Sequence, residues 1–225
     1  MSDRNPSQTS WAHLGDAVET VIPLWGVLVG TFVLCRIGEY LLVQSSHALP
    51  VAIGSYQLLG LIHDGQAALL LGTGLTAVYA IIFPFSRRAA FWTFTGGILM
   101  LGLAQLGLAY YFATTLQPLG RDLWGYNPTE IADTIRASGT VGLGTMAGAL
   151  LLTGLVVGSS LVARRYRAPA WIGYAGGGLM VVALLVPLPD PGGNRPSMQH
   201  LSTNKTLYLL TESTDALFAS REGSE

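Results

Sequence analysis

The chain has 225 residues, of which half are hydrophobic and only 11% are charged, whereas soluble domains carry about 25% charged residues. The formal net charge of -1 provides no basic surface for nucleic acid. The single cysteine, Cys35, excludes both an internal disulfide and a metal site built from cysteines. The composition therefore predicts a membrane protein with no nucleic-acid partner.

Long apolar runs recur along the chain. A helix needs roughly 20 apolar residues to cross a bilayer core about 30 Å thick, because its backbone amides must bond within the segment. Five stretches meet this requirement and predict an all-α integral membrane protein with a transmembrane domain over residues 18–187. The first run lacks a small-residue cleavage pattern, so we expect a retained anchor rather than a signal peptide. The expected spans are residues 18–44, 56–85, 89–116, 141–163 and 170–186.

Arginines mark two of the links between these spans. Arg87 and Arg88 follow the second span, and residues 164–167 after the fourth span contain three more arginines. Short cytoplasmic loops are enriched in lysine and arginine. This asymmetry predicts that residues 1–17 form a cytoplasmic segment and that residues 188–225 are extracytoplasmic.

Two pairs of polar residues interrupt the apolar spans. Arg36 and Glu39 lie three residues apart in the first span, on one helical face, and His63 with Asp64 falls at a similar depth in the second span. Charges at membrane depth are costly and normally face a bundle interior or water. The four residues are candidates for a structural cluster between helices, for a site that contacts lipid head groups, or for a transport path.

The third link, residues 117–140, is unusually polar. In "PLGRDLWGYNPTEIADTIRASG", Asn127 can cap a helix, Pro128 suits its first position, and Glu130 has the spacing of a capping box. We expect either a short amphipathic helix over residues 128–137 on the outer leaflet, or an ordered loop that covers the bundle. The candidate residues of this surface segment are Arg121, Trp124, Tyr126, Asn127 and Glu130.

These residues also carry a family resemblance. "PLGRDLWGY" and the short helix ending in "ASG", after an aromatic-ended span, resemble the third external segment of the lipoteichoic acid synthase-like membrane sulfatases, a branch of the alkaline phosphatase superfamily. "GLIHDGQAALLLG" in the second span is similar to a pattern of the same family. The resemblance covers residues 18–220. It implies five membrane helices in the bacterial cytoplasmic membrane, a cytoplasmic amino end and a large extracytoplasmic catalytic domain.

The tail begins with a linker, "PLPDPGGNRPS", and then regains order. Leu207, Leu210, Thr214 and Leu217 recur at helical spacing, which favours an amphipathic helix capped near residues 203–204. The resemblance leaves a second interpretation open. In it, "TLYLLTEST" is the first strand of the catalytic domain and Glu212 is a metal ligand; the spacing favours the helix, so we do not assign Glu212.

Members of the family use a threonine or a modified serine or cysteine nucleophile, with divalent metal held by Asp, Glu and His. The four histidines here are not spaced as a metal set, so no catalytic or metal residue is predicted. A divalent metal is expected only if a catalytic domain follows, and whether the protein is an enzyme stays open.

The leading hypothesis is a membrane-anchoring module of such a sulfatase or phosphotransferase, truncated before its catalytic domain or lacking one. Its expected partners are membrane lipids, a lipid-linked substrate, and an extracytoplasmic catalytic domain, its own or separate. The alternatives are a small transporter or channel subunit, and a non-catalytic scaffold that binds a partner through the tail helix.

Overall fold

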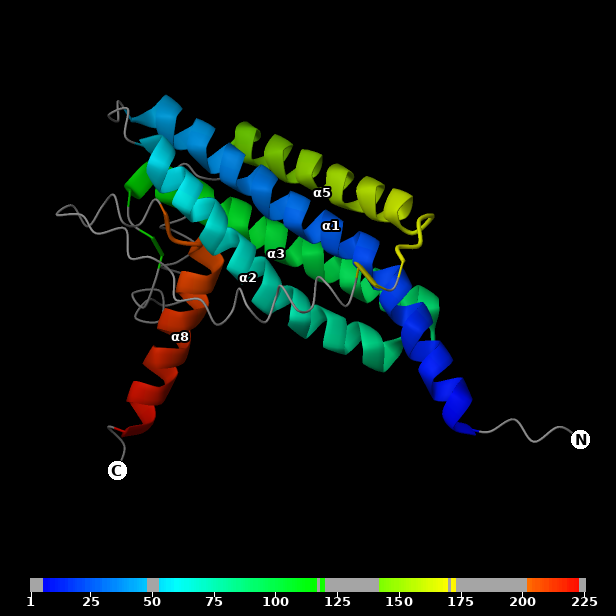
Figure 1. Cartoon of the computed structure of the whole chain (residues 1–225). Coiled ribbons are helices and arrows are strands. Elements are labelled where there is room, and N and C mark those ends of the chain that lie inside the picture. Colours follow the sequence, from blue (N-terminus) through cyan, green and yellow to red (C-terminus); the bar gives the residue numbers. More distant parts are fainter. Residues whose placement is uncertain are drawn as a thin grey trace, which may run out of the picture. The chain divides into compact units, whose positions relative to one another are not determined.

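The computed structural model describes residues 6–47, 53–116, 118–119, 142–169, 171–172 and 202–222. The described residues contain no strand. They form five helices (Figure 1), which are α1 (Pro6–Ser46), α2 (Ile53–Ile82), α3 (Arg87–Thr115), α5 (Leu143–Ala163) and α8 (Lys205–Glu222). The all-α prediction is confirmed for this part of the chain.

Four of the helices contain stretches that are long and apolar enough to cross a membrane. Many of their outward side chains are apolar too. Six large ones are between 60% and 76% exposed, namely Leu41, Leu58, Ile81, Met100, Leu150 and Leu151. Helices that are apolar all round suit a hydrocarbon surrounding better than water. The four stretches are Gly15–Ser46, Tyr56–Ile82, Arg87–Thr115 and Leu143–Ala163.

Two predicted segments lie wholly or mostly outside the described residues. Of the expected fifth span, 170–186, only Trp171 and Ile172 are described. The short helix expected over residues 128–137 lies outside the described residues. The same is true of the surface segment made of Arg121, Trp124, Tyr126, Asn127 and Glu130.

Helix α1 begins at Pro6 and not near residue 18. The apolar stretch gives the length of the span but does not fix where the helix starts, and proline fits the first turn because its missing N–H needs no partner there. A second proline, Pro23, lies inside the helix and leaves the carbonyl of Glu19 without its helical donor. The backbone N–H of Ala168 donates to that carbonyl at 3.2 Å. The bend in the blue part of α1 (Figure 1) is the change that an internal proline produces.

Both ends of α3 show why the helix begins and ends there. Ser86 caps its start, since the hydroxyl accepts a hydrogen bond from the N–H of Ala89 at 3.2 Å. At its end Leu116 adopts a left-handed backbone with a φ of 55°, a common way for a helix to stop. Pro118 follows two residues later and cannot continue the helix.

The chain divides into two compact units, and each long helix contributes to both. Unit 1 contains residues 1–31, 68–100 and 153–187. In it, Trp25 Nε1 donates to the hydroxyl of Thr76 at 3.0 Å. The Tyr79 hydroxyl lies 2.9 Å from that of Thr20, and the Tyr79 ring meets Phe94 edge to face. These contacts join α1, α2 and α3.

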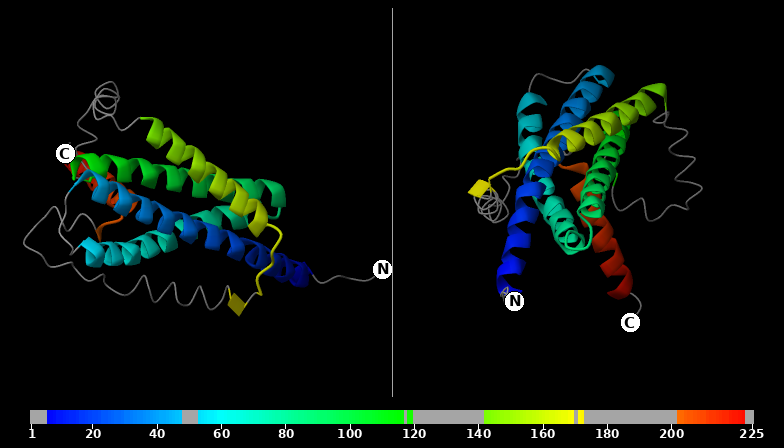
Figure 2. Two further views of the ribbon diagram at one scale, coloured as in Figure 1. Left: turned by 90° about the horizontal axis from the view of Figure 1, so that it is seen from above. Right: turned by 90° about the vertical axis from the view of Figure 1, so that its right-hand side faces the viewer.

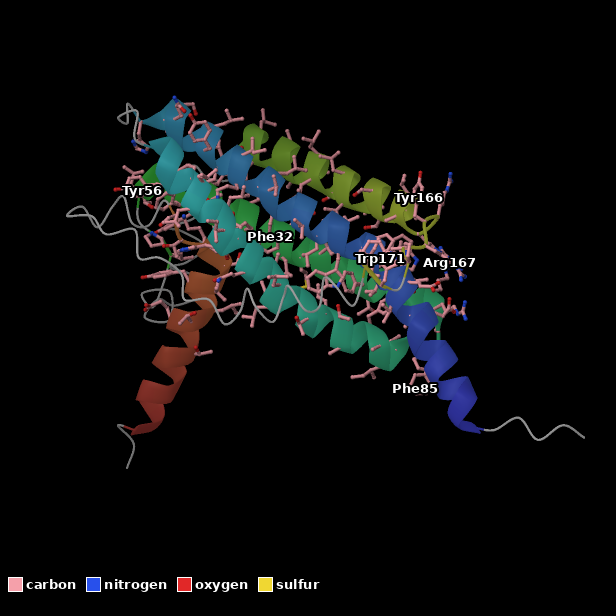
Figure 3. The ribbon with its side chains drawn as sticks, in the orientation of Figure 1. Phe32, Tyr56, Phe85, Tyr166, Arg167 and Trp171 are labelled. Atoms are coloured by element: carbon pink, nitrogen blue, oxygen red, sulfur yellow. The ribbon has the colours of Figure 1, made fainter. Side chains whose placement is uncertain are left out.

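Unit 2 contains residues 32–67, 101–152 and 188–225. Its apolar core is built on Val43, Phe112 and Ala113, against which Tyr56, labelled in Figure 3, also packs. His47 Nε2 lies 2.7 Å from the carbonyl oxygen of Ala113. Helix α8 belongs to this unit, and it is the orange-to-red ribbon in Figures 1 and 2.

Two glycines of α2 in unit 1 provide a test of this packing. A Cβ at Gly72 would lie 2.6 Å from Trp25 Cη2 and 2.8 Å from Leu28 Cδ2, whereas a Cβ at Gly74 meets nothing within 4 Å. We expect Gly72→Ala to destabilise the protein by roughly 1–3 kcal/mol through overpacking. Gly74→Ala should stabilise it by up to about 1 kcal/mol, because alanine is the better helix former. Thermal unfolding in detergent measures both, and shifts of the same sign would contradict this account.

Candidate functional site

A buried ion pair joins α1 and α2 inside unit 2. The guanidinium of Arg36 donates from Nε and Nη2 to the two carboxylate oxygens of Asp64, at 2.6 and 2.7 Å. Their side chains are only 4% and 1% exposed. The planar fork of arginine matches a carboxylate in this two-bond geometry, which is among the stronger hydrogen-bond arrangements in proteins.

The position of the guanidinium depends on Gly60, one helical turn before Asp64 in α2. Arg36 Nη2 donates to the carbonyl of Gly60 at 3.2 Å. A Cβ at Gly60 would lie 2.8 Å from Arg36 Cζ. The absence of a side chain at Gly60 therefore makes room for Arg36 against the backbone of α2.

The first residue of α8, Lys205, adds a second basic side chain to this group. Lys205 Nζ donates to Glu39 Oε1 at 3.0 Å, and Arg36 Nη1 donates to the same oxygen at 3.3 Å. The ammonium of Lys205 also lies 4.1 Å from the centre of the Phe112 ring, a favourable cation–π arrangement. We call Arg36, Glu39, Asp64 and Lys205 the charge cluster.

Uncharged groups at the start of α8 are bonded to the same helices. Asn204 caps α8 by accepting from the N–H of Leu207 at 2.8 Å, and its Nδ2 donates to Asp64 at 2.6 Å. The Thr206 hydroxyl donates to Gln105 of α3 at 2.7 Å. The beginning of α8 is thus hydrogen-bonded to α2 and α3, in addition to the ion pair of Lys205 with α1.

The charge cluster contains two basic and two acidic side chains, so its formal charges cancel. A buried ion that loses its partner is far more costly than a buried pair. Burial lowers the pKa of Lys205 to about 8, and the neighbouring Glu39 carboxylate opposes this shift. The 3.0 Å contact between Lys205 Nζ and Glu39 Oε1 favours the protonated ammonium.

The structure places three of the four predicted intramembrane residues, Arg36, Glu39 and Asp64, in one cluster. The fourth, His63, is half-buried, and its Nε2 has no hydrogen-bond partner among the described residues. Consecutive helical residues differ by about 100° around the axis, so His63 and Asp64 project in different directions.

The tail helix is confirmed, because Lys205–Glu222 is helical and Asn204 is its cap. The alternative of a strand over "TLYLLTEST" is wrong, since the alternation that a strand needs is missing there. Glu212 lies within α8. Within the described ranges, no group of three or more His, Cys, Asp or Glu residues is placed to hold a metal ion.

Local sequence patterns did not predict four residues of this site, namely Gly60, Gln105, Lys205 and Thr206. The sequence does contain one indication that Gln105 belongs to a site. It is a lone amide in an apolar span, and buried polar groups need hydrogen-bond partners. The contact of Lys205 with Glu39 crosses 166 residues of chain, and no local pattern encodes such a separation.

Comparison with models of protein families, with curated proteins and with solved structures found no match. The fold and the site therefore define the class by themselves. The described chain is an all-helical protein with four candidate membrane spans and a buried, charge-balanced cluster at the start of α8.

The charge balance can be tested with a double-mutant cycle. Arg36→Met or Asp64→Leu alone leaves one uncompensated buried charge, which should destabilise the protein by roughly 3–5 kcal/mol. The double variant retains only the Glu39–Lys205 ion pair, so we expect it to be more stable than either single variant. Unfolding in detergent would measure all three, and additive losses in the double variant would argue against charge balance.

Proposed function

We propose that this chain is a membrane-anchoring module that holds α8 in a fixed position as the connector to an extracytoplasmic domain. The observation that supports this proposal best is the charge cluster. Lys205 is bonded to Glu39 and Asn204 to Asp64, so two acidic groups of the bundle hold the first residues of α8.

Burial at the start of α8 supports a holding role. Ser202, Asn204 and Lys205 are each no more than 1% exposed, whereas Leu210 is 45% exposed. A helix that only lay on a surface would keep a lysine in solvent, since burying an ammonium is costly without a partner. The burial of a capping residue together with a lysine supports the proposal that the bundle holds the start of α8.

The same pairing provides no support for transport. A carrier site needs charged groups that can exchange partners with a solute. Among the described residues each member of the charge cluster already has an opposite charge in contact, at distances between 2.6 and 3.3 Å. Three of the charges belong to spans, and the fourth, Lys205, comes from the helix that the cluster holds.

The wider proposal uses the charge asymmetry and the resemblance noted in the sequence. The arginine-bearing links lie in the cytoplasm by the positive-inside rule, so α8 follows the last span outside. We propose that α8 connects to the catalytic domain of a lipoteichoic acid synthase-like sulfatase or phosphotransferase. That domain, in this protein or a separate one, supplies the nucleophile and divalent metal, while the module keeps it beside a lipid-linked substrate.

The holding role makes a prediction about the mobility of α8. Lys205→Met leaves Glu39 without this cation and Asn204→Ala removes the cap, so each should loosen the start of the helix. The first change should cost roughly 3 kcal/mol and the second about 1 kcal/mol. A nitroxide at Leu210→Cys, in a Cys35→Ala background and in nanodiscs, should show faster motion in both variants.

Thr214→Ala is the matched control. Thr214 is exposed in the same helix, and its hydroxyl bonds only to the carbonyl of Thr211 among the contacts found. The spectrum of this variant should equal that of the parent. Equal mobility of the label in Lys205→Met and in the parent would refute the holding role.

The enzymatic part of the proposal needs a separate experiment. The native protein can be purified from its own membranes with its partners and assayed for transfer or hydrolysis of phosphoglycerol and sulfate groups. We expect a metal-dependent activity that chelation abolishes, on the same polypeptide or on a co-purifying one. A preparation with neither such an activity nor a nucleophile-bearing domain would overturn the enzymatic part and leave the holding role to be judged by mobility.

A further inference from the structure

Five exposed arginines gather in unit 1, beside the link between α2 and α3 and in the link that follows α5. Arg87 and Arg88 are the first two residues of α3 and of its apolar stretch, and residues 164–167 come directly after α5, which ends at Ala163. We call the set the arginine surface; it consists of Arg87, Arg88, Arg164, Arg165 and Arg167.

One carboxylate brings the two links together. Asp16 of α1 accepts Arg87 Nη2 on Oδ2 at 2.6 Å and Arg167 Nη1 on Oδ1 at 3.2 Å. Both arginine side chains stay at least 60% exposed while they do so. Arg164 lies 5.2 Å from the centre of the Phe91 ring, which fixes the end of α5 against the start of α3.

The arginine surface keeps a net positive charge. Within the described part of the chain, Asp16 is the only acidic side chain that pairs with these five arginines. Arg88 and Arg165 are exposed and have no ion pair among the described residues. One carboxylate orients two guanidinium groups but leaves most of the positive charge available to a ligand.

Large aromatic side chains occur close to the arginines in the sequence. Tyr166 is adjacent to Arg167, Trp171 follows four residues later, and Phe85 lies two residues before Arg87 (Figure 3). They are between 65% and 87% exposed. Exposed tyrosine and tryptophan at the end of an apolar span are typical of the head-group level of a bilayer.

We propose that the arginine surface binds the phosphate head groups of anionic phospholipids. Juxtamembrane clusters of four to eight basic residues attract anionic lipids, and the guanidinium fork can bind phosphate oxygens through two parallel bonds. The aromatic residues place this charge at the depth of the lipid phosphates. The inference is independent of what α8 connects to.

The test measures binding of short-chain phosphatidylglycerol to the full chain in neutral detergent by native mass spectrometry. The unaltered protein should bind phosphatidylglycerol more tightly than phosphatidylcholine, and added salt should weaken the difference. Arg88→Gln combined with Arg165→Gln should weaken phosphatidylglycerol binding about 25-fold, at about fivefold for each arginine. Inorganic phosphate should compete poorly, since it lacks the acyl chains that hold a lipid beside the spans.

The matched control is Arg88→Lys combined with Arg165→Lys, which keeps both charges and should retain most of the preference. Equal affinity of the unaltered protein for the two lipids would overturn the proposal without reference to any variant. Equal losses in the glutamine and lysine pairs would overturn it as well. Efficient competition by inorganic phosphate would replace a lipid surface with a free-anion site, and would also refute the proposal.

Discussion

The two-bond ion pair between Arg36 and Asp64 is the contact on which the rest of unit 2 depends. It fixes α1 against α2 through a geometry that tolerates little rotation, because both nitrogens must face both oxygens. The pair also orients the hydrogen-bonding atoms of Arg36 and Asp64 that take part in further contacts. Asp64 can then accept from Asn204, and Arg36 can contact Glu39 beside Lys205. Helix α8 is thereby held by groups already positioned between two other helices.

This use of charge follows from the surroundings. Apolar contacts between helices in a bilayer gain little over contacts with lipid tails, so close packing and hydrogen bonds decide which helices associate. The described helices show both devices. Gly72 lets Trp25 approach α2 closely in unit 1, and the charge cluster supplies the polar contacts in unit 2. The charge cluster can stabilise the bundle only while its charges balance, because removing any one member leaves a buried charge without its counter-ion.

The charged residues of the chain divide into two classes with different physical roles. Members of the charge cluster are shielded from solvent, so their pairing is strong and sets internal geometry. The arginines of the two links are exposed, so their pairing with Asp16 contributes little stability and leaves their charge directed outward. The first class bonds the start of α8 to the other helices, and the second carries the charge that our proposal assigns to the binding of anionic lipids.

The amino-acid sequence alone predicted an all-helical membrane protein, five apolar spans and the tail helix; the described residues confirm four long apolar stretches and the helix. Each follows from local chemistry: run length for the spans, and the asparagine cap with leucine spacing for α8. It also singled out Arg36, Glu39 and Asp64, because charged groups inside apolar runs are rare. Only the tertiary structure decided that Lys205 and Asn204 complete this group, and that Asp16 joins the two arginine links. These contacts join segments far apart in the chain, and such pairing depends on how the helices pack rather than on any local pattern.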